Sequence, residues 1–178
     1  MRIGYGEDIH ELVPNRDLIL GGIKIPFDKG EKAHSDGDVL LHALSEAMLG
    51  ALALGDLGKH FPDTIKETEN MDSKIILKKI YEMVKEAGYH LINADISIIL
   101  ERPKLKDYIL QIRENIAKVI DVDVNQISVK AESRPDRSHH GHNRSRRGSS
   151  AAGGRYSRGR SAGRHPWCRK RCARRPWR

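Results

Sequence analysis

Residues 38–54, DVLLHALSEAMLGALAL, carry the pattern that decides the fold of the first half of the chain. Apolar side chains recur there every three or four residues, which predicts an amphipathic helix. We expect Ser35 or Asp36 to cap its N-terminus and residues 55–58 to end it. The apolar stripe comprises Leu40, Leu44, Ala47, Met48 and Ala51.

Strand-like and helix-like segments alternate around this helix. They predict an α/β fold, in detail an α+β sandwich in which helices pack on one face of a mixed β-sheet. The expected elements are an extended segment over 1–9, a hairpin over 18–25 around Gly21 and Gly22, a helix from Asp72 or Ser73 to Gly88, a strand over 91–100, a helix beginning at Pro103 and a strand over 127–131.

Charge divides the 178 residues into two parts. Fourteen Arg and one Lys against Asp136 give residues 134–178 a net charge of +14, so residues 1–133 carry −6 of the total of +8. Residues 134–178 contain no Val, Ile, Leu, Met or Phe, and such a composition cannot bury enough apolar surface to fold. We therefore expect a folded domain over 1–133 and a disordered Arg/Gly/Ser-rich tail over 134–178.

The tail has several possible origins and roles. Lys outnumbers Arg thirteen to four before residue 132, but Arg dominates after it, which indicates a different coding origin, a reading-frame error or a genuine appendage. Its basic residues, with Tyr156, Trp167 and Trp177 among them, are typical of a nonspecific nucleic-acid-binding arm. His165, Cys168 and Cys172 have loosely ligand-like spacing but lack a second matching pair for zinc.

The expected cellular location depends on two kinds of segment, a membrane span and a secretory leader, that we do not recognise in the sequence. No apolar run approaches the roughly 20 residues that span a bilayer, and Met1 does not begin a recognisable secretory leader. Both cysteines lie in the tail, so the domain has no disulfide framework. We expect a cytoplasmic protein with no membrane partner.

Three side chains form a candidate metal site. Asp8 and His10 are two residues apart, which in a strand puts them on one face. His42 lies off the apolar stripe of the predicted helix, one turn after Asp38, which is positioned to orient it. Two imidazoles and a carboxylate are a three-ligand zinc set with an open fourth position, although surface or capping roles also fit this spacing.

The start of the same helix is a candidate anion site. Free backbone N–H groups and the helix dipole favour a negative ligand there, and His34 and Ser35 add donors. An ordinary N-cap is the alternative. Residues 55–58 and 61–64 read as a loop whose carboxylates, Asp56 and Asp63, suit sugar hydroxyls or simply solvent.

Six ordered motifs closely resemble the 2-C-methyl-D-erythritol 2,4-cyclodiphosphate synthase family. They are DIH (8–10), LGG (20–22), AHSDGD (33–38), HA (42–43), GDLG (55–58) and FPDT (61–64), within a resemblance that spans residues 1–131. It implies a homotrimeric phosphorus–oxygen lyase of isoprenoid precursor biosynthesis. Such an enzyme cyclises 4-diphosphocytidyl-2-C-methyl-D-erythritol 2-phosphate and releases CMP.

The resemblance also implies site residues. Zn²⁺ would be bound by Asp8, His10 and His42, while His34 and Ser133 would be catalytic. Residues 56–58 and 61–65 would hold the methylerythritol part, and residues 100–106 with Ala131 would frame the cytidine. The implied substrate-binding residues are Asp8, His10, His34, Ser35, Asp56, Leu57, Gly58, Phe61, Pro62, Asp63, Thr64, Ile65, Leu100, Glu101, Arg102, Pro103, Lys104, Leu105, Lys106 and Ala131.

The chain departs from the family pattern after Ala131. Ser133 stands in place of a threonine, and Glu132 puts a negative charge near the phosphates. Pro135 stands where the family has a glutamate for a second divalent ion, Mg²⁺ or Mn²⁺, and proline cannot ligate through its side chain. The family's closing strand is missing, so we expect impaired activity. A nucleic-acid-binding protein is the alternative function.

Overall fold

The computed structural model describes residues 1–62 and 71–132, and it confirms the α/β class. The strands in these residues form three two-stranded sheets instead of the single mixed sheet that we expected. Two sheets are antiparallel and one is parallel. They pair β1 (Leu12–Pro14) with β4 (Lys29–Glu31), β2 (Leu18–Leu20) with β3 (Ile23–Ile25), and β5 (Ala94–Ile99) with β6 (Ile127–Glu132).

Strand prediction succeeded where side chains alternate and failed where they do not. The hairpin around Gly21 and Gly22 is confirmed, with both glycines at positive φ. β4 was missed because its sequence, Lys-Gly-Glu, has no apolar alternation. Among the described residues, 1–11 belong to no strand, so the expectation that Asp8 and His10 lie in one is wrong.

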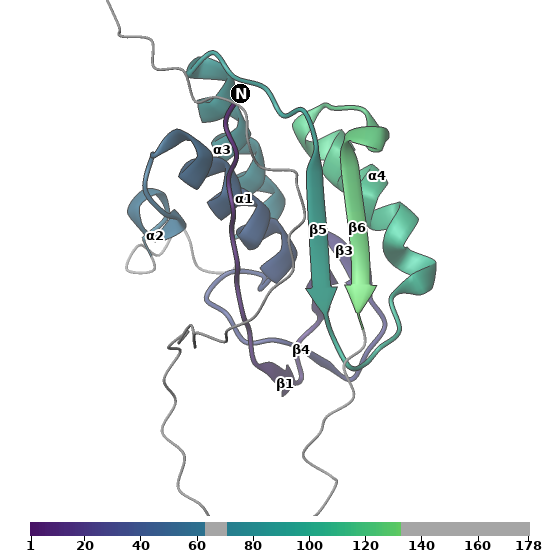
Figure 1. Cartoon of the computed structure of the whole chain (residues 1–178). Helices are drawn as coiled ribbons and strands as arrows, with labels where there is room; N and C mark the ends of the chain where they lie inside the picture. The colour runs from purple at the N-terminus through teal and green to yellow at the C-terminus, as the bar shows by residue number, and fades with distance from the viewer. Residues whose placement is uncertain (63–70, 133–178) are drawn as a thin grey trace, which may run out of the picture. The chain divides into compact units, whose positions relative to one another are not determined.

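Figure 1 shows α4 against the β5–β6 pair and α1 beside α3. The predicted helices are confirmed, except that the last, α4, begins at Ile109 after the 3-10 turn η2 and not at Pro103. Leu57 and Gly58, expected in a loop, begin the short helix α2. The bounds are α1 (Val39–Leu52), α2 (Leu57–His60), α3 (Ser73–Glu86), η2 (Lys106–Tyr108), α4 (Ile109–Ile120) and η3 (Val124–Gln126).

One apolar core joins these elements. The hairpin, the helices and the parallel pair all contribute side chains with almost no exposed surface, which stabilises the arrangement by the hydrophobic effect. No helix within 1–62 or 71–132 is long and apolar enough to cross a membrane. The largest fully buried apolar side chains are Leu18, Leu20, Ile25, Leu41, Leu49, Leu77, Ile80, Ile112, Ile116, Ile120 and Ile127.

Asp38 connects the hairpin to the start of α1. Its carboxylate accepts hydrogen bonds from the backbone N–H groups of Leu41 at 3.1 Å, Gly21 at 3.0 Å and Gly22 at 2.5 Å. Asp38 is therefore the N-cap of α1, and the expectation of Ser35 or Asp36 in that place is wrong. Burial raises the pKa of Asp38 to about 7, although its three N–H partners act to lower that pKa.

We predict that Asp38→Ala lowers the free energy of unfolding much more than loss of an ordinary helix cap does. The substitution removes a helix cap, worth about 1 kcal/mol, and leaves buried N–H groups without a partner at about 1–3 kcal/mol. Asp38 is completely buried, whereas the side chain of Asp72, the N-cap of α3, is 43% exposed. Urea unfolding should show that Asp38→Ala lowers the free energy of unfolding by about 2–4 kcal/mol and Asp72→Ala by about 1 kcal/mol. Equal losses would contradict the role assigned to Asp38.

The predicted boundary between a domain at 1–133 and a tail at 134–178 lies at the end of the described residues. The division, and the disorder predicted for the tail, stay predictions.

Candidate functional site

Two glycines bring the N-terminal segment against α1. A Cβ on Gly4 would overlap the carbonyl oxygen of Ala47, and one on Gly6 would overlap that of Ala43. Only glycine lets the two backbones approach so closely. The segment therefore runs along α1 (Figure 1), and this approach carries Asp8 and His10 to the face of α1 that bears His42.

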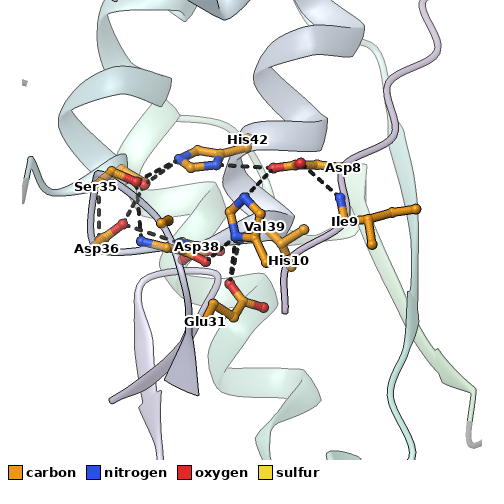
Figure 2. A network of polar contacts seen from close by, with 12 residues as sticks. Asp8, Ile9, His10, Glu31, Ser35, Asp36, Asp38, Val39 and His42 are labelled. Atoms are coloured by element: carbon orange, nitrogen blue, oxygen red, sulfur yellow. Dashed lines mark hydrogen bonds and ion pairs between the residues drawn. The ribbon is translucent and has the colours of Figure 1, made fainter. Parts of the chain in front are cut away.

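Asp8, His10 and His42 converge into one cluster. Asp8 Oδ2 lies 3.1 Å from His10 Nε2 and 3.1 Å from His42 Nδ1. The three candidate ligand atoms all lie within 4.8 Å of one another. Figure 2 shows both imidazoles directed at the Asp8 carboxylate from different elements. The sequence-predicted trio is thus brought together, even though its first two members lie in no strand.

In each imidazole, the ring nitrogen that does not face Asp8 lies within hydrogen-bond distance of another polar group. His10 Nδ1 lies 3.1 Å from the carbonyl oxygen of Gly37, which can only accept, so this nitrogen carries the proton. Gly37 has φ +84°, a conformation that glycine adopts readily. His42 Nε2 lies 2.9 Å from Ser73 Oγ. The nitrogens that face Asp8 are therefore the ones left for a ligand.

Asp38 does not orient His42, as the sequence had suggested. The carboxylate of Asp38 is turned back to the N–H groups of its own helix and of the hairpin, and only its backbone carbonyl meets the backbone N–H of His42, at 3.1 Å. An N-cap side chain folds toward the helix start, which takes it away from the face that bears the next turn.

The charges of the cluster favour a bound cation. Burial by itself raises the pKa of the Asp8 carboxyl, but hydrogen bonds from His10 and His42 outweigh it and hold that pKa far below its usual range. Hydrogen bonds with Asp8 and with Glu31 raise the pKa of His10 to about 10. Without a metal, a proton thus occupies Nε2 of His10, where a metal would bind, and metal binding would release it.

The donor set fits a metal ion such as zinc. One carboxylate oxygen and two imidazole nitrogens are a common three-ligand set, and partners on the outer ring nitrogens are typical of metal-binding histidines. The side chains of Asp8, His10 and His42 are 26%, 14% and 13% exposed, so the cluster is enclosed but still reachable.

The loop before α1 lies beside this cluster. Ser35 is buried, and its Oγ is 3.3 Å from His42 Nε2, whereas His34 is exposed. Arg16 holds the loop by donating hydrogen bonds to the carbonyl oxygens of Ala33 at 3.0 Å and Ser35 at 2.9 Å. This arrangement places the Ser35 hydroxyl and the N-terminus of α1 next to the candidate metal ligand His42.

A separate pocket of about 410 Å³ lies at the end of the parallel strand pair. Five of the seven residues predicted in the 100–106 segment line it, together with Ala131. Glu101 and Arg102 are exposed and lie outside that lining. The peptide bond between Arg102 and Pro103 is cis. The lining residues are Leu100, Pro103, Lys104, Leu105, Lys106, Ile109 and Ala131.

The remaining predicted site residues are only partly described. Asp56 is the N-cap of α2 and accepts a hydrogen bond from the Lys59 backbone N–H at 2.9 Å. The rest of the predicted segment includes Leu57 and Gly58 in α2 and the half-buried Phe61 and Pro62 after it. Asp63, Thr64, Ile65 and Ser133 lie outside the described residues.

Residues 1–150 match the sequence profile of the YgbB family. The chain belongs to the YgbB family. Over 131 residues it is 54% identical to 2-C-methyl-D-erythritol 2,4-cyclodiphosphate synthase of Acinetobacter baumannii strain SDF, covering 74% of this chain and 82% of the relative.

Solved structures agree with this assignment to the YgbB family. A CDP-bound 2C-methyl-D-erythritol-2,4-cyclodiphosphate synthase has a TM-score of 0.70 and 37% identity, covering 73% of this chain and 87% of that one. The bifunctional IspDF of Campylobacter jejuni has a TM-score of 0.71 and 46% identity, covering 74% of this chain. This chain spans about a third, 36%, of that longer protein.

Sequence reasoning missed three residues that contact the metal cluster or the loop beside it. Ser73 contacts His42, Arg16 fixes the loop at Ser35, and Glu31 lies 3.5 Å from His10 Nδ1 and accepts from the Val39 N–H at 3.0 Å. No spacing in the sequence links these residues to the cluster. Only the structure shows that Glu31 is buried, and this burial indicates a partner because a carboxylate is rarely buried alone.

We predict that Gly6→Ala impairs metal binding without a general loss of structure. The added methyl group would push the N-terminal segment away from Ala43 and move Asp8 and His10 from His42. Zinc affinity, measured by competition with a chelator, should fall by about tenfold or more.

The matched control is Gly50→Ala. Gly50 is exposed on α1, where a Cβ would meet nothing closer than Tyr5 O at 3.8 Å. Alanine there should stabilise the helix by about 0.5–1 kcal/mol and leave zinc affinity unchanged. If both variants bind zinc equally well, the close approach at Gly6 does not position the ligands.

Proposed function

We propose that this chain cyclises 4-diphosphocytidyl-2-C-methyl-D-erythritol 2-phosphate to 2-C-methyl-D-erythritol 2,4-cyclodiphosphate and releases CMP. The observation that carries this proposal is the convergence of Asp8, His10 and His42 beside the start of α1. The relatives named as synthases, and the relative with bound CDP, support the substrate class. The reaction is that of a phosphorus–oxygen lyase in isoprenoid precursor synthesis.

Zinc is the metal that we assign to the cluster. Asp8 Oδ2, His10 Nε2 and His42 Nδ1 would hold it, and the carbonyl of Gly37 and the hydroxyl of Ser73 would fix the two rings from behind. When bound, such an ion supplies Lewis-acid polarisation of phosphoryl oxygens and a template for two phosphates.

The main physical obstacle to the reaction is repulsion between two anionic phosphate groups. The residues in the loop before α1 would reduce this repulsion. His34 and Ser35 would donate to phosphate oxygens, and the positive end of the α1 dipole would add potential where charge develops, although the N–H groups of Val39 and Leu41 are already bonded to Glu31 and Asp38. The 2-phosphate attacks the β-phosphorus, and the bond to CMP breaks. Because both phosphates belong to one substrate, holding them in place also supplies proximity.

The pocket beside the strand pair is proposed to take the cytidine. Its volume of about 410 Å³ and its mixed lining of Leu105, Pro103 and two lysines suit a base with a nearby phosphate. Residues 56–58 and 61–65 would hold the methylerythritol. The roles of Asp63, Thr64, Ile65, Glu101, Arg102 and Ser133, the cytoplasmic location and the second divalent ion stay predictions.

We further propose a homotrimer with active sites between neighbouring protomers. Ile3, Tyr5 and Ile9 support an interface, because they are 85%, 80% and 82% exposed in the single chain. Exposed apolar patches of this kind mark interaction surfaces. The nucleic-acid-binding alternative gains no support from the comparisons with known proteins, and the residues it depends on lie outside 1–62 and 71–132.

The proposed activity is tested with the full chain, loaded with zinc and supplied with the cytidyl substrate. We expect CMP and the cyclic diphosphate in equal amounts by ³¹P NMR. His42→Ala should lower turnover by about 100-fold or more, because a bound metal supplies several kcal/mol of charge stabilisation.

Ser45→Ala is the control for His42→Ala. Ser45 lies on α1, is buried, and its hydroxyl has no hydrogen-bond partner among the described residues. Its turnover should match that of the parent chain. A zinc-loaded protein that releases no CMP, or that works equally well without His42, contradicts the proposed function.

A further inference from the structure

Ser73 lies at a junction of three elements. It is the first residue of α3 and is completely buried. Its Oγ is 2.5 Å from Asp36 Oδ1 in the loop before α1, and 2.9 Å from Nε2 of His42 on α1. A buried hydroxyl thus bridges a carboxylate and a residue of the metal cluster.

The directions of these hydrogen bonds follow from the chemistry of the groups. The Asp36 carboxylate can only accept, and it receives both the Ser73 hydroxyl proton at Oδ1 and the Ser73 backbone N–H at Oδ2, the latter at 3.1 Å. The single hydroxyl proton of Ser73 is therefore committed to Asp36. Toward His42, Ser73 Oγ can only accept, so Nε2 must carry a proton.

A second hydroxyl does not replace this contact. Ser35 Oγ is 3.3 Å from His42 Nε2 and already accepts from the Gly37 N–H at 3.2 Å. It also belongs to the loop that we assign to substrate phosphate. Ser73, by contrast, is anchored to Asp36 through two hydrogen bonds and faces no assigned substrate group.

We propose that Ser73, held by Asp36, is a positioning residue that fixes the ring of His42 with its proton on Nε2. This tautomer leaves the lone pair of Nδ1 directed toward Asp8, which is the arrangement that a metal requires. The inference rests on the proposed metal site. It adds two residues that act through His42 and do not touch substrate.

Asp36 also connects the Ser73–His42 contact to the rest of the fold. Its backbone N–H donates to the carbonyl of Met71 at 3.2 Å, and its Oδ1 accepts from the Asp38 N–H at 3.3 Å. The start of α3 is thereby joined to the start of α1. The orientation of His42 consequently depends on a helix that contributes no metal ligand.

The test compares Ser73→Ala with Ser45→Ala in the full chain. Both substitutions remove one buried hydroxyl, but only Ser73 contacts His42. Zinc affinity is measured by chelator competition, with no substrate present. We expect Ser73→Ala to weaken binding by about tenfold or more and Ser45→Ala to stay within about twofold of the parent chain, because the Ser45 hydroxyl makes no hydrogen bond within the described residues.

Two further variants separate positioning from general damage. Ser73→Thr keeps the hydroxyl and should recover most of the affinity. Asp36→Asn can accept only one of the two Ser73 hydrogen bonds and should give an intermediate loss. Nitrogen-15 NMR of the zinc-loaded parent should show His42 protonated at Nε2 and metal-bound at Nδ1, with a mixed or altered ring state in Ser73→Ala.

The outcomes distinguish this inference from the proposed function. If the parent chain binds zinc and Ser73→Ala binds it equally well with the same His42 tautomer, the positioning role is overturned while the metal site stands. If the parent chain binds no zinc, both fall. If zinc binding depends on Ser73 but no CMP is released, the positioning role stands and the proposed reaction fails.

Discussion

The site depends on the contact of one carboxylate with two imidazoles. Asp8 Oδ2 lies 3.1 Å from a nitrogen of His10 and from a nitrogen of His42, and it joins the N-terminal segment to α1. Within the described residues this segment belongs to no strand. It is held instead by the close approach of Gly4 and Gly6 to α1 and by this polar cluster. The geometry that permits metal binding is thus also what fixes the segment.

Three aspartates near the start of α1 have three different roles because their surroundings differ. Asp8 is partly exposed and faces two imidazoles, so it stays ionised and offers an oxygen to a cation. Asp36 accepts from Ser73 and holds α3 in place. Asp38 is completely buried and satisfies three backbone N–H groups. Residue type alone does not separate these roles, whereas burial and partners do.

Periodicity predicted the elements that bury one regular face. The helices α1 and α3, the hairpin and the strands β5 and β6 follow directly from the spacing of apolar residues. It failed for β1, β4 and α2, which are only three or four residues long: β4 has no apolar alternation, and α2 buries none of its residues. The expectation of a single sheet was wrong because the pairing of strands leaves no local signal in the sequence.

The candidate site was predicted less from spacing than from the resemblance of whole motifs. Asp8, His10 and His42 come together as expected, and most of the 100–106 segment lines a pocket. Asp38 was assigned the wrong role because sequence spacing cannot tell a cap from an outer contact of a histidine. Ser73 was missed because α3 reaches His42 only through tertiary packing, 31 residues along the chain.

The central claim is that the three converging side chains form a metal centre. X-ray absorption spectroscopy of the zinc-loaded full chain tests it most directly. The account predicts nitrogen and oxygen neighbours at about 2.0–2.2 Å, with multiple scattering from two imidazole rings. Sulfur neighbours at about 2.3 Å, as from Cys168 and Cys172, or a shell without imidazole would contradict it.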